Sequence, residues 1–523
     1  MSRRGPDAVS TVSIPFLASS SNGKLSASVL SLRGNGLTRQ PVKVGKLETS
    51  YFCWNGEVYR RRTADGHTAH MDDDIQGSDT QMMATLVMEL GFEAALSQIH
   101  GEYATLLVNP DSTSNQHLWM ARDRLGRRSL LWHREPGLAV VSSVGPVLSD
   151  RTQNAIDCLN FEEVPSDCIY SLQVTDTELV WTQCPHPVSL PAFNRVLPEP
   201  ENIRILPSSD NVLPSVDYEE ALTDSMNAIS SAVSVRVLSA PTASSGKDAR
   251  IAVLFSGGLD SSVLAYYAHV HLPLSEPIDL INVSFENPRT ANDTEDIYDV
   301  PDRKTGRRAL QELRRLAPNR QWQFVEVDVP FAKVTEYRSR IIDLMAPLNS
   351  VMDLSIALAF WFAARGIGHL RDNGNKLHPY TSAARVLLSG LGADEQLAGY
   401  SRHAGRFQSR SYAGLVNELA MDVERLPYRN LGRDDRIMAD HGREVRFPFL
   451  DELVMNLWSS LPIYQKADLR LGKGIGDKLL LRWVAERVGL GSVATEAKRA
   501  VQFGSRTAKM MDNSKGHEHV MRT

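Results

Sequence analysis

Seven prolines fall within residues 185–214, a stretch of thirty residues. Neither the interior of a helix nor an inner strand tolerates this density, because proline cannot donate the backbone hydrogen bond that both structures use. A chain of 523 residues is also longer than a single hydrophobic core usually supports. We therefore expect two domains separated by a linker and followed by a polar tail, with the bounds 1–184, 185–214, 215–506 and 507–523.

The part of the chain before the linker has the sequence pattern of a strand-rich domain with few helices. Short runs of alternating apolar and polar residues, such as LETSYFCWNGEVYRR and GEYATLLVN, are separated by Gly, Asn, Asp and Pro. This pattern is typical of antiparallel strands joined by turns. The polar residues 19–24 and the C-terminal tail lack such a pattern, and we expect both to be loose.

After the linker, helices alternate with apolar strands. A helix is expected to begin at Asp217, because Glu220 completes a capping-box pattern and apolar residues then recur at helical spacing. Continuous apolar runs separated by helical segments indicate a parallel sheet that is covered on both faces. The expected strands are residues 250–255, 278–285, 322–329 and 384–390, and the expected helices include 306–316 and 354–367.

Composition excludes several classes of protein. A net charge of −5 and a pI near 6.3 show that the chain lacks the excess of positive charge that is typical of nucleic-acid-binding proteins. No apolar run approaches the roughly 20 residues of a membrane-spanning helix, and the N-terminal stretch lacks the apolar core of a signal peptide. We therefore expect a cytosolic or nuclear protein, with the cytoplasm as its compartment, and no membrane partner.

The cysteines show no CxxC spacing and have no histidine pairs nearby, so the sequence does not support a zinc site. Since the chain is expected to be intracellular, the thiols should be reduced. We expect buried, reduced thiols at Cys53, Cys158, Cys168 and Cys184.

The most informative short stretch is FSGGLDSS, residues 255–262, which follows an apolar strand and precedes a helical run. In open parallel sheets, ligands bind beyond the carboxyl ends of the strands. Gly257 and Gly258 let phosphate oxygens approach the backbone, while serine hydroxyls and the helix N-terminus offer hydrogen-bond donors. The stretch therefore predicts a phosphate-binding loop. The stretch lacks the lysine of a Walker loop, so transfer of a γ-phosphate is not indicated. The alternative is a turn that only caps a helix. That alternative would fit a bare SGG better than it fits the full octet.

Asp260 is the one carboxylate within this loop. A carboxylate that faces phosphate oxygens repels them unless a divalent cation lies between the two. The sequence therefore predicts that magnesium binds together with the phosphates.

SGGLDSS resembles the pyrophosphate loop of the ATP-pyrophosphatase enzymes, which cleave ATP to AMP and pyrophosphate while they adenylate a substrate. Two further stretches, LLSGLGADEQLAGYSRH at 387–403 and RDDRIMADHGREVRFPFLD at 433–451, resemble the synthetase domain of glutamine-dependent asparagine synthetases. Their form, together with RNLGRDD, GKGIGDKLLLR and KRAVQFGSR, resembles the asparagine synthetase domain-containing protein 1 subfamily. The resemblance covers residues 218–506 and, more weakly, the N-terminal half. It implies a doubly wound parallel-sheet domain of the adenine nucleotide α-hydrolase-like type.

The resemblance assigns roles to the residues that match the family's motifs. It implies that Asp260 and Asp394 hold the magnesium ion jointly. Lys498 falls where the family carries a lysine that neutralises charge on the α-phosphate as pyrophosphate leaves. Taken alone, Asp394 with Glu395 also fits a surface acidic pair, and Lys498 with Arg499 also fits a solvated basic run. The residues implied to bind ATP are Phe255, Ser256, Gly257, Gly258, Leu259, Asp260, Ser261, Ser262, Val283, Ser389 and Gly390.

Charged residues alternate ahead of the PFLD stretch, at Arg433, Asp435, Glu444 and Arg446. Alternating charges of this kind usually form a network of salt bridges. We favour such a scaffold over direct contact with the substrate.

One position departs from the asparagine synthetase pattern. Where the family reads SGEG, this chain reads SGLG, which places Leu391 at the position of a glutamate thought to serve the acyl-adenylate and ammonia step. Leucine can neither move protons nor hold ammonium. Either another catalytic group, with Glu395 as the candidate, takes over this role, or amide formation is impaired.

The N-terminal half resembles the glutaminase domain of the same family, through RRGPD at 3–7, WNGEVYR at 54–60 and RDRLGRRSLLWH at 122–133. This resemblance implies an Ntn-hydrolase type α+β sandwich, truncated at its start. Asn55 and Gly56 match the pair that forms the oxyanion hole, and the glutaminase remnant would comprise Asn55, Gly56 and Glu57.

Glutamine hydrolysis in the family needs an N-terminal cysteine whose α-amine activates its thiol, whereas this chain begins Met1-Ser2-Arg3. In the family the RGPD stretch also follows a first strand and helix, so we expect the chain to begin inside the domain. At the position of the arginine that would clamp the glutamine carboxylate stands Val29. We therefore expect no glutaminase activity from this chain.

The sequence leaves two functions open. The first is an ATP-dependent ligase that adenylates the side-chain carboxylate of aspartate and transfers ammonia, either free or derived from glutamine, to give asparagine. The second is a homologue impaired in catalysis that keeps ATP binding and acts through partners, which Leu391, Val29 and the missing cysteine favour. A tRNA-modifying ATP-pyrophosphatase ranks last, because neither a basic RNA-binding face nor cysteines near the loop are present. A homodimer is a candidate assembly.

Overall fold

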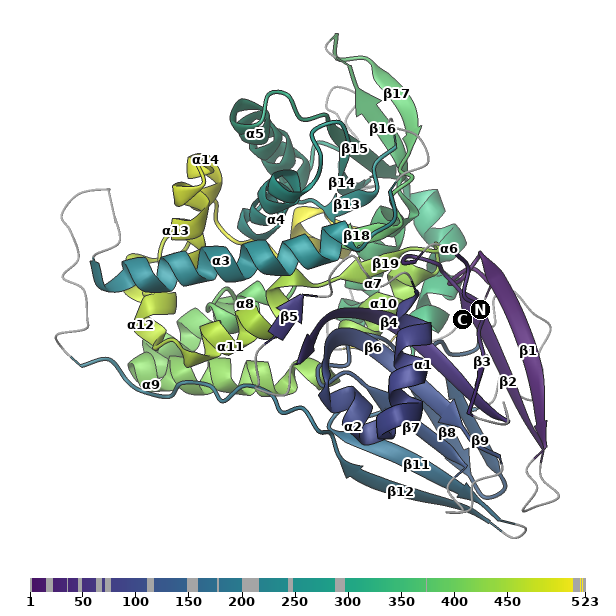
Figure 1. Ribbon diagram of the computed structural model, residues 1–523. Helices are drawn as coiled ribbons and strands as arrows, with labels where there is room; N and C mark the ends of the chain where they lie inside the picture. Colours follow the sequence, from purple (N-terminus) through teal and green to yellow (C-terminus); the bar gives the residue numbers. More distant parts are fainter. Residues whose placement is uncertain are drawn as a thin grey trace.

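The computed structural model describes residues 2–15, 22–34, 36–45, 49–62, 68–70, 77–110, 117–147, 159–175, 178–199, 216–242, 248–286, 297–372, 374–510, 518 and 520. Figure 1 shows an N-terminal domain of antiparallel sheets, in purple and blue, and a C-terminal domain in which helices surround a mostly parallel sheet, in teal to yellow. The chain therefore forms two domains with mixed sheets and helices, as the sequence predicts. Within the described residues, no helix is long and apolar enough to cross a membrane.

A seven-stranded antiparallel sheet forms the centre of the N-terminal domain, in the order β12-β11-β7-β6-β4-β3 with β5 beside β4. Helices α1 and α2 cover one of its faces, where Phe52, Val87 and Leu96 are buried. The side chain of Ser78 accepts a hydrogen bond from the first turn of α1 and so caps that helix. The elements are β3 Val42–Val44, β4 Ser50–Arg62, β5 Thr68–His70, α1 Asp79–Leu90, α2 Phe92–Ser97, β6 Ile99–Val108, β7 Leu118–Arg122, β11 Cys168–Val174 and β12 Leu179–Pro185.

A three-stranded sheet, in the order β10-β8-β9, packs on the opposite face of the large sheet. Side chains alternate along a strand, so Met120 and Tyr170 face this second sheet, while Ala121 and Ile169, their chain neighbours, face the helices. The elements of this sheet are β8 Leu131–Glu135, β9 Leu138–Ser142 and β10 Glu162–Glu163. The domain is thus a sandwich of two sheets with helices on one side.

An antiparallel hairpin, β1 (Ala8–Pro15) and β2 (Asn22–Val29), forms a separate two-stranded sheet. The prediction that residues 19–24 are loose is wrong for 22–24, because their backbone pairs with β1; residues 19–21 lie outside the described residues. Strand pairing there does not need an apolar side-chain pattern, which is why the sequence did not show it.

The three described cysteines are free thiols, and Cys158 lies outside the described residues. Cys53, Cys168 and Cys184 are half-buried rather than fully buried. Desolvation raises the pKa of the Cys53 thiol to about 12, which keeps it protonated and unreactive at neutral pH.

The described part of the linker, residues 186–199, runs along the C-terminal domain. The backbone amide of Asn194 donates a hydrogen bond to the carbonyl of Ser459 at 2.8 Å. The ring of Phe193 lies 4.0 Å from the ammonium nitrogen of Lys466, which is fully buried. The linker thus adds side chains to the surface of the second domain rather than standing clear of it.

The C-terminal domain is built on a seven-stranded sheet in the order β17-β16-β15-β14-β13-β18-β19. β13, β14, β15, β18 and β19 run parallel, while β16 and β17 form an antiparallel hairpin at one edge. Because β13 lies inside the sheet, between β14 and β18, the chain first winds toward β15 and then returns to add β18 and β19 on the other side. The sheet is doubly wound, and the four predicted strands are confirmed. The strands are β13 Ile251–Leu254, β14 Ile278–Phe285, β15 Trp322–Val329, β16 Ile367–Arg371, β17 Leu377–Thr381, β18 Val386–Leu388 and β19 Glu444–Arg446.

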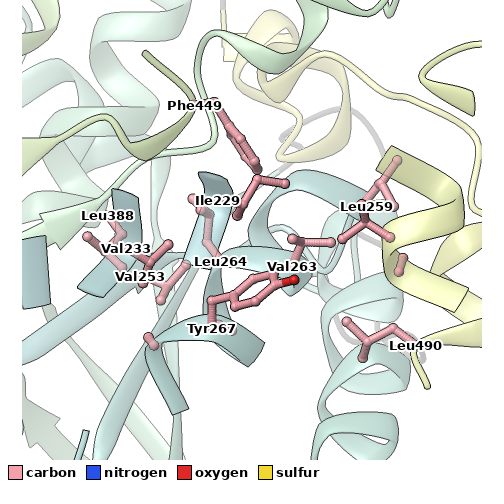
Figure 2. Packing of buried hydrophobic residues seen from close by; sticks show 14 of the residues in the cluster. Ile229, Val233, Val253, Leu259, Val263, Leu264, Tyr267, Leu388, Phe449 and Leu490 are labelled. Atoms are coloured by element: carbon pink, nitrogen blue, oxygen red, sulfur yellow. The ribbon is translucent and has the colours of Figure 1, made fainter. Parts of the chain in front are cut away.

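Helices cover both faces of this sheet. In β13, Val253 faces one apolar cluster and Ala252 faces the other. Figure 2 shows the first cluster, which contains Val253 together with Ile229 of α3 and Val263 of α4. Helix α3 begins one residue before the predicted Asp217, whose side chain lies outside the described residues. The helices are α3 Val216–Leu238, α4 Leu259–His271, α5 Pro301–Leu316, α6 Phe331–Met345, α7 Val351–Arg365, α8 Ala393–Gln396, α9 Ser401–Arg425, α10 Leu431–Ala439, α11 Glu452–Ser460, α12 Ile463–Lys466, α13 Leu479–Arg487, α14 Gly491–Ala494 and α15 Val501–Gly504.

The C-terminal tail is not loose throughout, contrary to the prediction. Residues Thr507–Met510 form a 3₁₀ turn in which Met510 is buried. The carbonyl of Glu518 accepts a hydrogen bond from the amide of Val351, and Val520 packs against the apolar cluster under α7. Isolated apolar residues in a polar tail suffice to fasten it, although they form no periodic pattern.

Candidate active site

The site lies where the winding of the C-terminal sheet reverses. β13 and β18 are neighbours in the sheet, although the chain forms β14 and β15 between them. The carboxyl ends of strands at such a switch point are where ligands of open α/β sheets bind. The loop after β13 is FSGGLDSS, and the loop after β18 begins with Ser389 and Gly390. The two loops touch, since a Cβ added to Gly390 would lie 2.8 Å from the Cβ of Asp260.

The loop after β13 depends on its two glycines. Gly257 has a φ of +76°, and a Cβ on it would clash with the backbone of Gly306 in α5. Gly258 is the N-cap of α4 and makes no side-chain cap, so the first amides of that helix are left for another acceptor. Ser256 Oγ accepts a hydrogen bond from the amide of Gly258 at 3.3 Å and closes the turn. This geometry presents backbone amides at a helix N-terminus, which is an arrangement that binds phosphate.

The remaining loop residues differ in what they can offer a ligand. Leu259, the first residue of α4, packs into the hydrophobic core and is labelled in Figure 2. Ser261 Oγ donates to the carbonyl of Gly258 at 3.2 Å. Ser262 Oγ is buried and has no hydrogen-bond partner in the described part of the chain. The backbone of the loop is therefore the main candidate for contacts with phosphate.

A lysine that sequence analysis did not single out bridges the two carboxylates predicted to hold magnesium. The Nζ atom of Lys478 lies 2.8 and 2.7 Å from the two carboxylate oxygens of Asp260, and 2.7 Å from Oδ1 of Asp394. Burial alone would lower the pKa of Lys478, but these two carboxylates outweigh burial and raise the pKa. The only signal in the sequence was the glycine-rich stretch GKGIGDK, which ends at this lysine.

Asp394 is buried, with 6 % of its surface exposed, so it does not form a surface pair with Glu395. Lys498 forms an ion pair with Oδ2 of Asp394, which places this lysine in the site rather than in a solvated basic run. Burial alone would raise the pKa of Asp394, but Lys478 and Lys498 outweigh burial and hold the pKa well below its usual range. Four charged groups therefore alternate across the site, in the order Asp260, Lys478, Asp394, Lys498.

Glu395 lies next to this row of charges on the short helix α8. Oε1 of Glu395 accepts a hydrogen bond from the hydroxyl of Tyr400 at 2.5 Å, while Oε2 is buried without a partner in the described chain. Burial, followed by the charge of Asp394, raises the pKa of the Glu395 carboxyl. A buried carboxyl with a raised pKa and an unused oxygen is suited to proton transfer. The catalytic role of Glu395 stays a prediction.

The other predicted positions lie at the ends of strands. Phe255 follows β13 and Val283 lies near the end of β14, and both side chains are buried. Leu391 packs against the apolar cluster on the second face of the sheet, and its amide donates to Ser389 Oγ at 3.4 Å. An apolar group thus occupies the position that would need a polar side chain for proton transfer.

The carboxylates of Asp260 and Asp394 fit a magnesium ion. Magnesium in proteins commonly binds one or two carboxylates and completes its shell with water and substrate phosphates. Oxygens of both carboxylates lie within 2.8 Å of a single ammonium nitrogen, so one small cation can reach both residues. The two side chains have the donor type and the mutual placement that the ion requires.

The charged stretch ahead of PFLD forms a buried network between the domains, which confirms the scaffold that we favoured. Arg446 pairs with Glu444 at 2.7 Å within β19 and with Glu57 of β4 at 3.1 Å across the interface. Asp435 pairs with Arg4 of the N-terminal domain at 2.7 Å. These residues therefore join the domains rather than facing the row of charges at the active site.

A second group of buried charges extends this joint. Arg236 of α3 contacts Glu102 of the N-terminal domain at 2.9 Å and Asp451 at 2.6 Å, and all three side chains are almost fully buried. Arg433, the remaining residue of the stretch, pairs with Asp353 inside the C-terminal domain. Ion pairs of this kind hold a geometry firmly, because removing one partner leaves a buried charge uncompensated.

The predicted glutaminase remnant lines a cavity of about 200 Å³ whose wall comes mostly from the N-terminal domain and, at Asp435, Ala439, Arg443 and Glu444, from the C-terminal domain. Asn55, Gly56 and Glu57 follow one another along its wall in β4. A Cβ on Gly56 would clash with a backbone carbonyl of β6, so the pairing of β4 and β6 requires glycine there. Arg33 lies in the same cavity and donates to Asp79 at 3.0 Å. The cavity thus contains a cation of the chain itself, already paired with a carboxylate.

Comparisons with known proteins agree with this organisation. Residues 29–149 match the glutamine amidotransferase domain family, and residues 406–519 match the asparagine synthase family. The chain is 36 % identical to human asparagine synthetase domain-containing protein 1, over 93 % of this chain and 88 % of the human protein. The chain belongs to the family of asparagine synthetase domain-containing proteins.

Other members and relatives support the same assignment. A Saccharomyces cerevisiae asparagine synthetase domain-containing protein is 34 % identical, over 94 % of this chain and 85 % of the yeast protein. The glutamine-hydrolysing asparagine synthetase of Mus musculus is 23 % identical, over 86 % of this chain and 71 % of the mouse enzyme. The asparagine synthase match includes Lys478 and Lys498 but begins after the loop at 255–262. The family match therefore does not include the loop, and its geometry is what favours phosphate binding there.

Proposed function

We propose that this protein is an ATP-dependent ligase of the asparagine synthetase type. It adenylates the side-chain carboxylate of aspartate with release of pyrophosphate, and then transfers ammonia to give asparagine and AMP. One observation supports this proposal most: a glycine-rich loop at a helix N-terminus, two carboxylates and two lysines converge at the switch point of a doubly wound sheet.

In this proposal, the loop after β13 holds the phosphates of ATP. Gly257 and Gly258 leave the first amides of α4 accessible, and these amides donate to phosphate oxygens. Ser389 at the end of β18 and Val283 near the end of β14 border the adenosine. The nucleotide would thus lie across the switch point, with its phosphates toward the row of charges.

Lys498 then acts on the α-phosphate. Its ammonium group pairs with Asp394, so positive charge is already in place where negative charge builds as pyrophosphate leaves. Preorganised charge of this kind is a large contribution to catalysis. Asp260 and Asp394 would hold a magnesium ion, which supplies positive charge to the phosphate oxygens when bound.

The reaction has two bond-making steps. A carboxylate oxygen of aspartate forms a bond to the α-phosphorus while the bond from that phosphorus to the bridging oxygen of pyrophosphate breaks. The nitrogen of ammonia then bonds to the activated carbonyl carbon, AMP leaves, and the nitrogen loses a proton. Glu395 is the candidate acceptor of that proton, because its carboxyl is buried and one of its oxygens has no hydrogen-bond partner among the described residues.

Leu391 favours a second candidate function. It packs against the apolar cluster and offers no group for proton transfer where the family has a glutamate. A homologue that binds ATP but is impaired in amide formation, and that acts through partners, would tolerate this change. The two candidates differ in the second chemical step and not in nucleotide binding.

The test combines ATP–pyrophosphate exchange with detection of asparagine by mass spectrometry, on the purified full chain with ATP, Mg²⁺, aspartate and ammonia. Asp260→Ala serves as the control. Aspartate-dependent exchange together with asparagine supports the ligase. Exchange without asparagine means that adenylation survives and amidation does not. ATP binding with neither product contradicts the ligase and favours the impaired homologue.

We further propose that the protein works in the cytoplasm on small molecules, namely ATP, aspartate and ammonia. The net charge of −5 gives no support for a polyanionic partner. Cell fractionation tests the compartment, and the exchange assay with other amino acids in place of aspartate tests the substrate.

A further inference from the structure

One ammonium group bridges both carboxylates of the proposed metal site. The Nζ atom of Lys478 contacts both oxygens of Asp260 and Oδ1 of Asp394, all at 2.7 to 2.8 Å. Only 2 % of the Lys478 side chain is exposed, so solvent screens these interactions little. Without this cation, two carboxylates at such short range would repel each other.

The backbone and a neighbouring glycine hold Lys478 in this place. Its φ of +54° is a conformation that residues with a side chain rarely adopt, and strained residues of this kind cluster at functional sites. Its amide donates to the carbonyl of Leu397 at 2.8 Å. A Cβ on Gly399 would clash with Cε of Lys478 and with Oδ1 of Asp394. The chain is thus fitted closely around this one ion pair.

We propose that Lys478 stands in for magnesium in the ATP-free protein. Its ammonium group keeps Asp260 and Asp394 together until magnesium-ATP enters, and then passes from the carboxylates to the phosphate oxygens. This inference rests on the proposed function, because it assumes that the two carboxylates take a magnesium ion. The backbone of Lys478 can stay fixed during the exchange, since rotation of the flexible side-chain stem moves the ammonium group.

The charges of the site balance in both states. In the ATP-free protein, the carboxylates of Asp260 and Asp394 are matched by the ammonium groups of Lys478 and Lys498. A divalent cation matches the same two carboxylates alone. Both ammonium groups are then available for the phosphate charges of ATP.

The test measures metal binding and nucleotide binding separately on the full chain. Mn²⁺ binding without nucleotide is followed by electron paramagnetic resonance, and ATP binding with excess Mg²⁺ by titration calorimetry. We expect Lys478→Met to bind Mn²⁺ about tenfold more tightly than the wild type, because no ammonium competes for the carboxylates. We also expect it to bind magnesium-ATP about tenfold more weakly, because one cation for the phosphates is lost.

Two results would overturn the proposal. A lysine that served only as a structural ion pair would leave magnesium-ATP binding unchanged or tighter in Lys478→Met, since the metal would enter more easily. An unchanged affinity for Mn²⁺ would show that Lys478 does not occupy the metal site.

Three further variants support the comparison. Lys473→Met, an exposed lysine of the same stretch, should change neither affinity. Adding Asp394→Asn to Lys478→Met should abolish the gain in Mn²⁺ affinity. If Lys478→Met does not fold, Lys478→Gln should raise Mn²⁺ affinity in its place, because a neutral amide carries no positive charge to compete for the carboxylates. If the wild type binds magnesium-ATP but shows no ATP–pyrophosphate exchange, the ligase function is contradicted. The replacement of the Lys478 ammonium group by magnesium is not contradicted by that result.

Discussion

Arg446 of β19 and Glu57 of β4 meet across the domain interface, with 3.1 Å between a guanidinium nitrogen and a carboxylate oxygen. Both side chains are buried. Burial raises the pKa of Glu57, against the opposing charge of Arg446. A residue in the stretch that resembles a glutaminase site therefore helps to join the two domains, and its retention in the chain does not require glutamine hydrolysis.

Arg446→Met should destabilise the protein by about 3–5 kcal/mol, because Glu57 and Glu444 would remain buried and lose the cation that they share. Urea unfolding followed by fluorescence measures the change. Arg487→Met is the matched control, since the Arg487–Glu219 pair is exposed and should contribute less than about 1 kcal/mol. Equal effects of the two substitutions would contradict a structural role for the buried network.

Gly257→Ala should lower pyrophosphate release by about a hundredfold, because the added methyl group clashes with Gly306 and shifts the loop by a fraction of an ångström or more. The rate is measured with a coupled pyrophosphate assay at saturating ATP. Gly405→Ala, at a position with open space around it, should keep the wild-type rate. Full activity of Gly257→Ala would mean that this loop does not hold the phosphates.

Leu391→Glu should raise the ratio of asparagine to AMP, because it restores a carboxylate at the position where the family pattern has one. The ratio is measured by mass spectrometry under single-turnover conditions. Leu391→Gln has the same size without the charge and should give a smaller increase. A ratio that does not move in either variant would show that amide formation does not depend on this position.

Lys466 should make stability rise with pH. It is fully buried and donates to the carbonyl of Trp458 at 2.8 Å, and burial lowers its pKa from 10.5 to about 7. Between these two values the unfolded chain binds more protons than the folded chain, so stability increases with pH across that window and the gain is lost below pH 7.

Lys466→Met should remove this rise, whose slope reaches at most about 1.4 kcal/mol per pH unit. Urea titrations of both proteins across the window measure it as a difference between two curves. Parallel curves would mean that Lys466 keeps its ordinary pKa in the folded protein.

The sequence was sufficient for the strands whose two faces are both buried. β13, β14 and β15 are rich in apolar residues on both faces because helices cover both sides of the sheet. β19 could not be found in this way, since its charged residues Glu444 and Arg446 are buried through an ion pair with each other and through pairs with Arg128 and Glu57 of the N-terminal domain. A local pattern carries no information about such partners.

The candidate site also contains residues that the sequence could predict and one that it could not. The loop around Asp260 was predictable, because the chemistry of phosphate binding acts within a few consecutive residues. Lys478 was missed, since its significance arises only when the loops after β13 and β18 and the start of α13 come together. No spacing within the chain indicates that one lysine reaches both Asp260 and Asp394.

The most direct test of the ligase follows a single oxygen atom. Adenylation joins a side-chain carboxylate oxygen of aspartate to the α-phosphorus of ATP, and that oxygen remains on AMP when ammonia displaces it. Aspartate labelled in this carboxylate with a heavy oxygen isotope is incubated with the protein, ATP, Mg²⁺ and ammonia, and AMP is analysed by mass spectrometry. We predict labelled AMP with the wild type and none with Asp260→Ala. Unlabelled AMP, or ADP as the product, would contradict adenylation of aspartate.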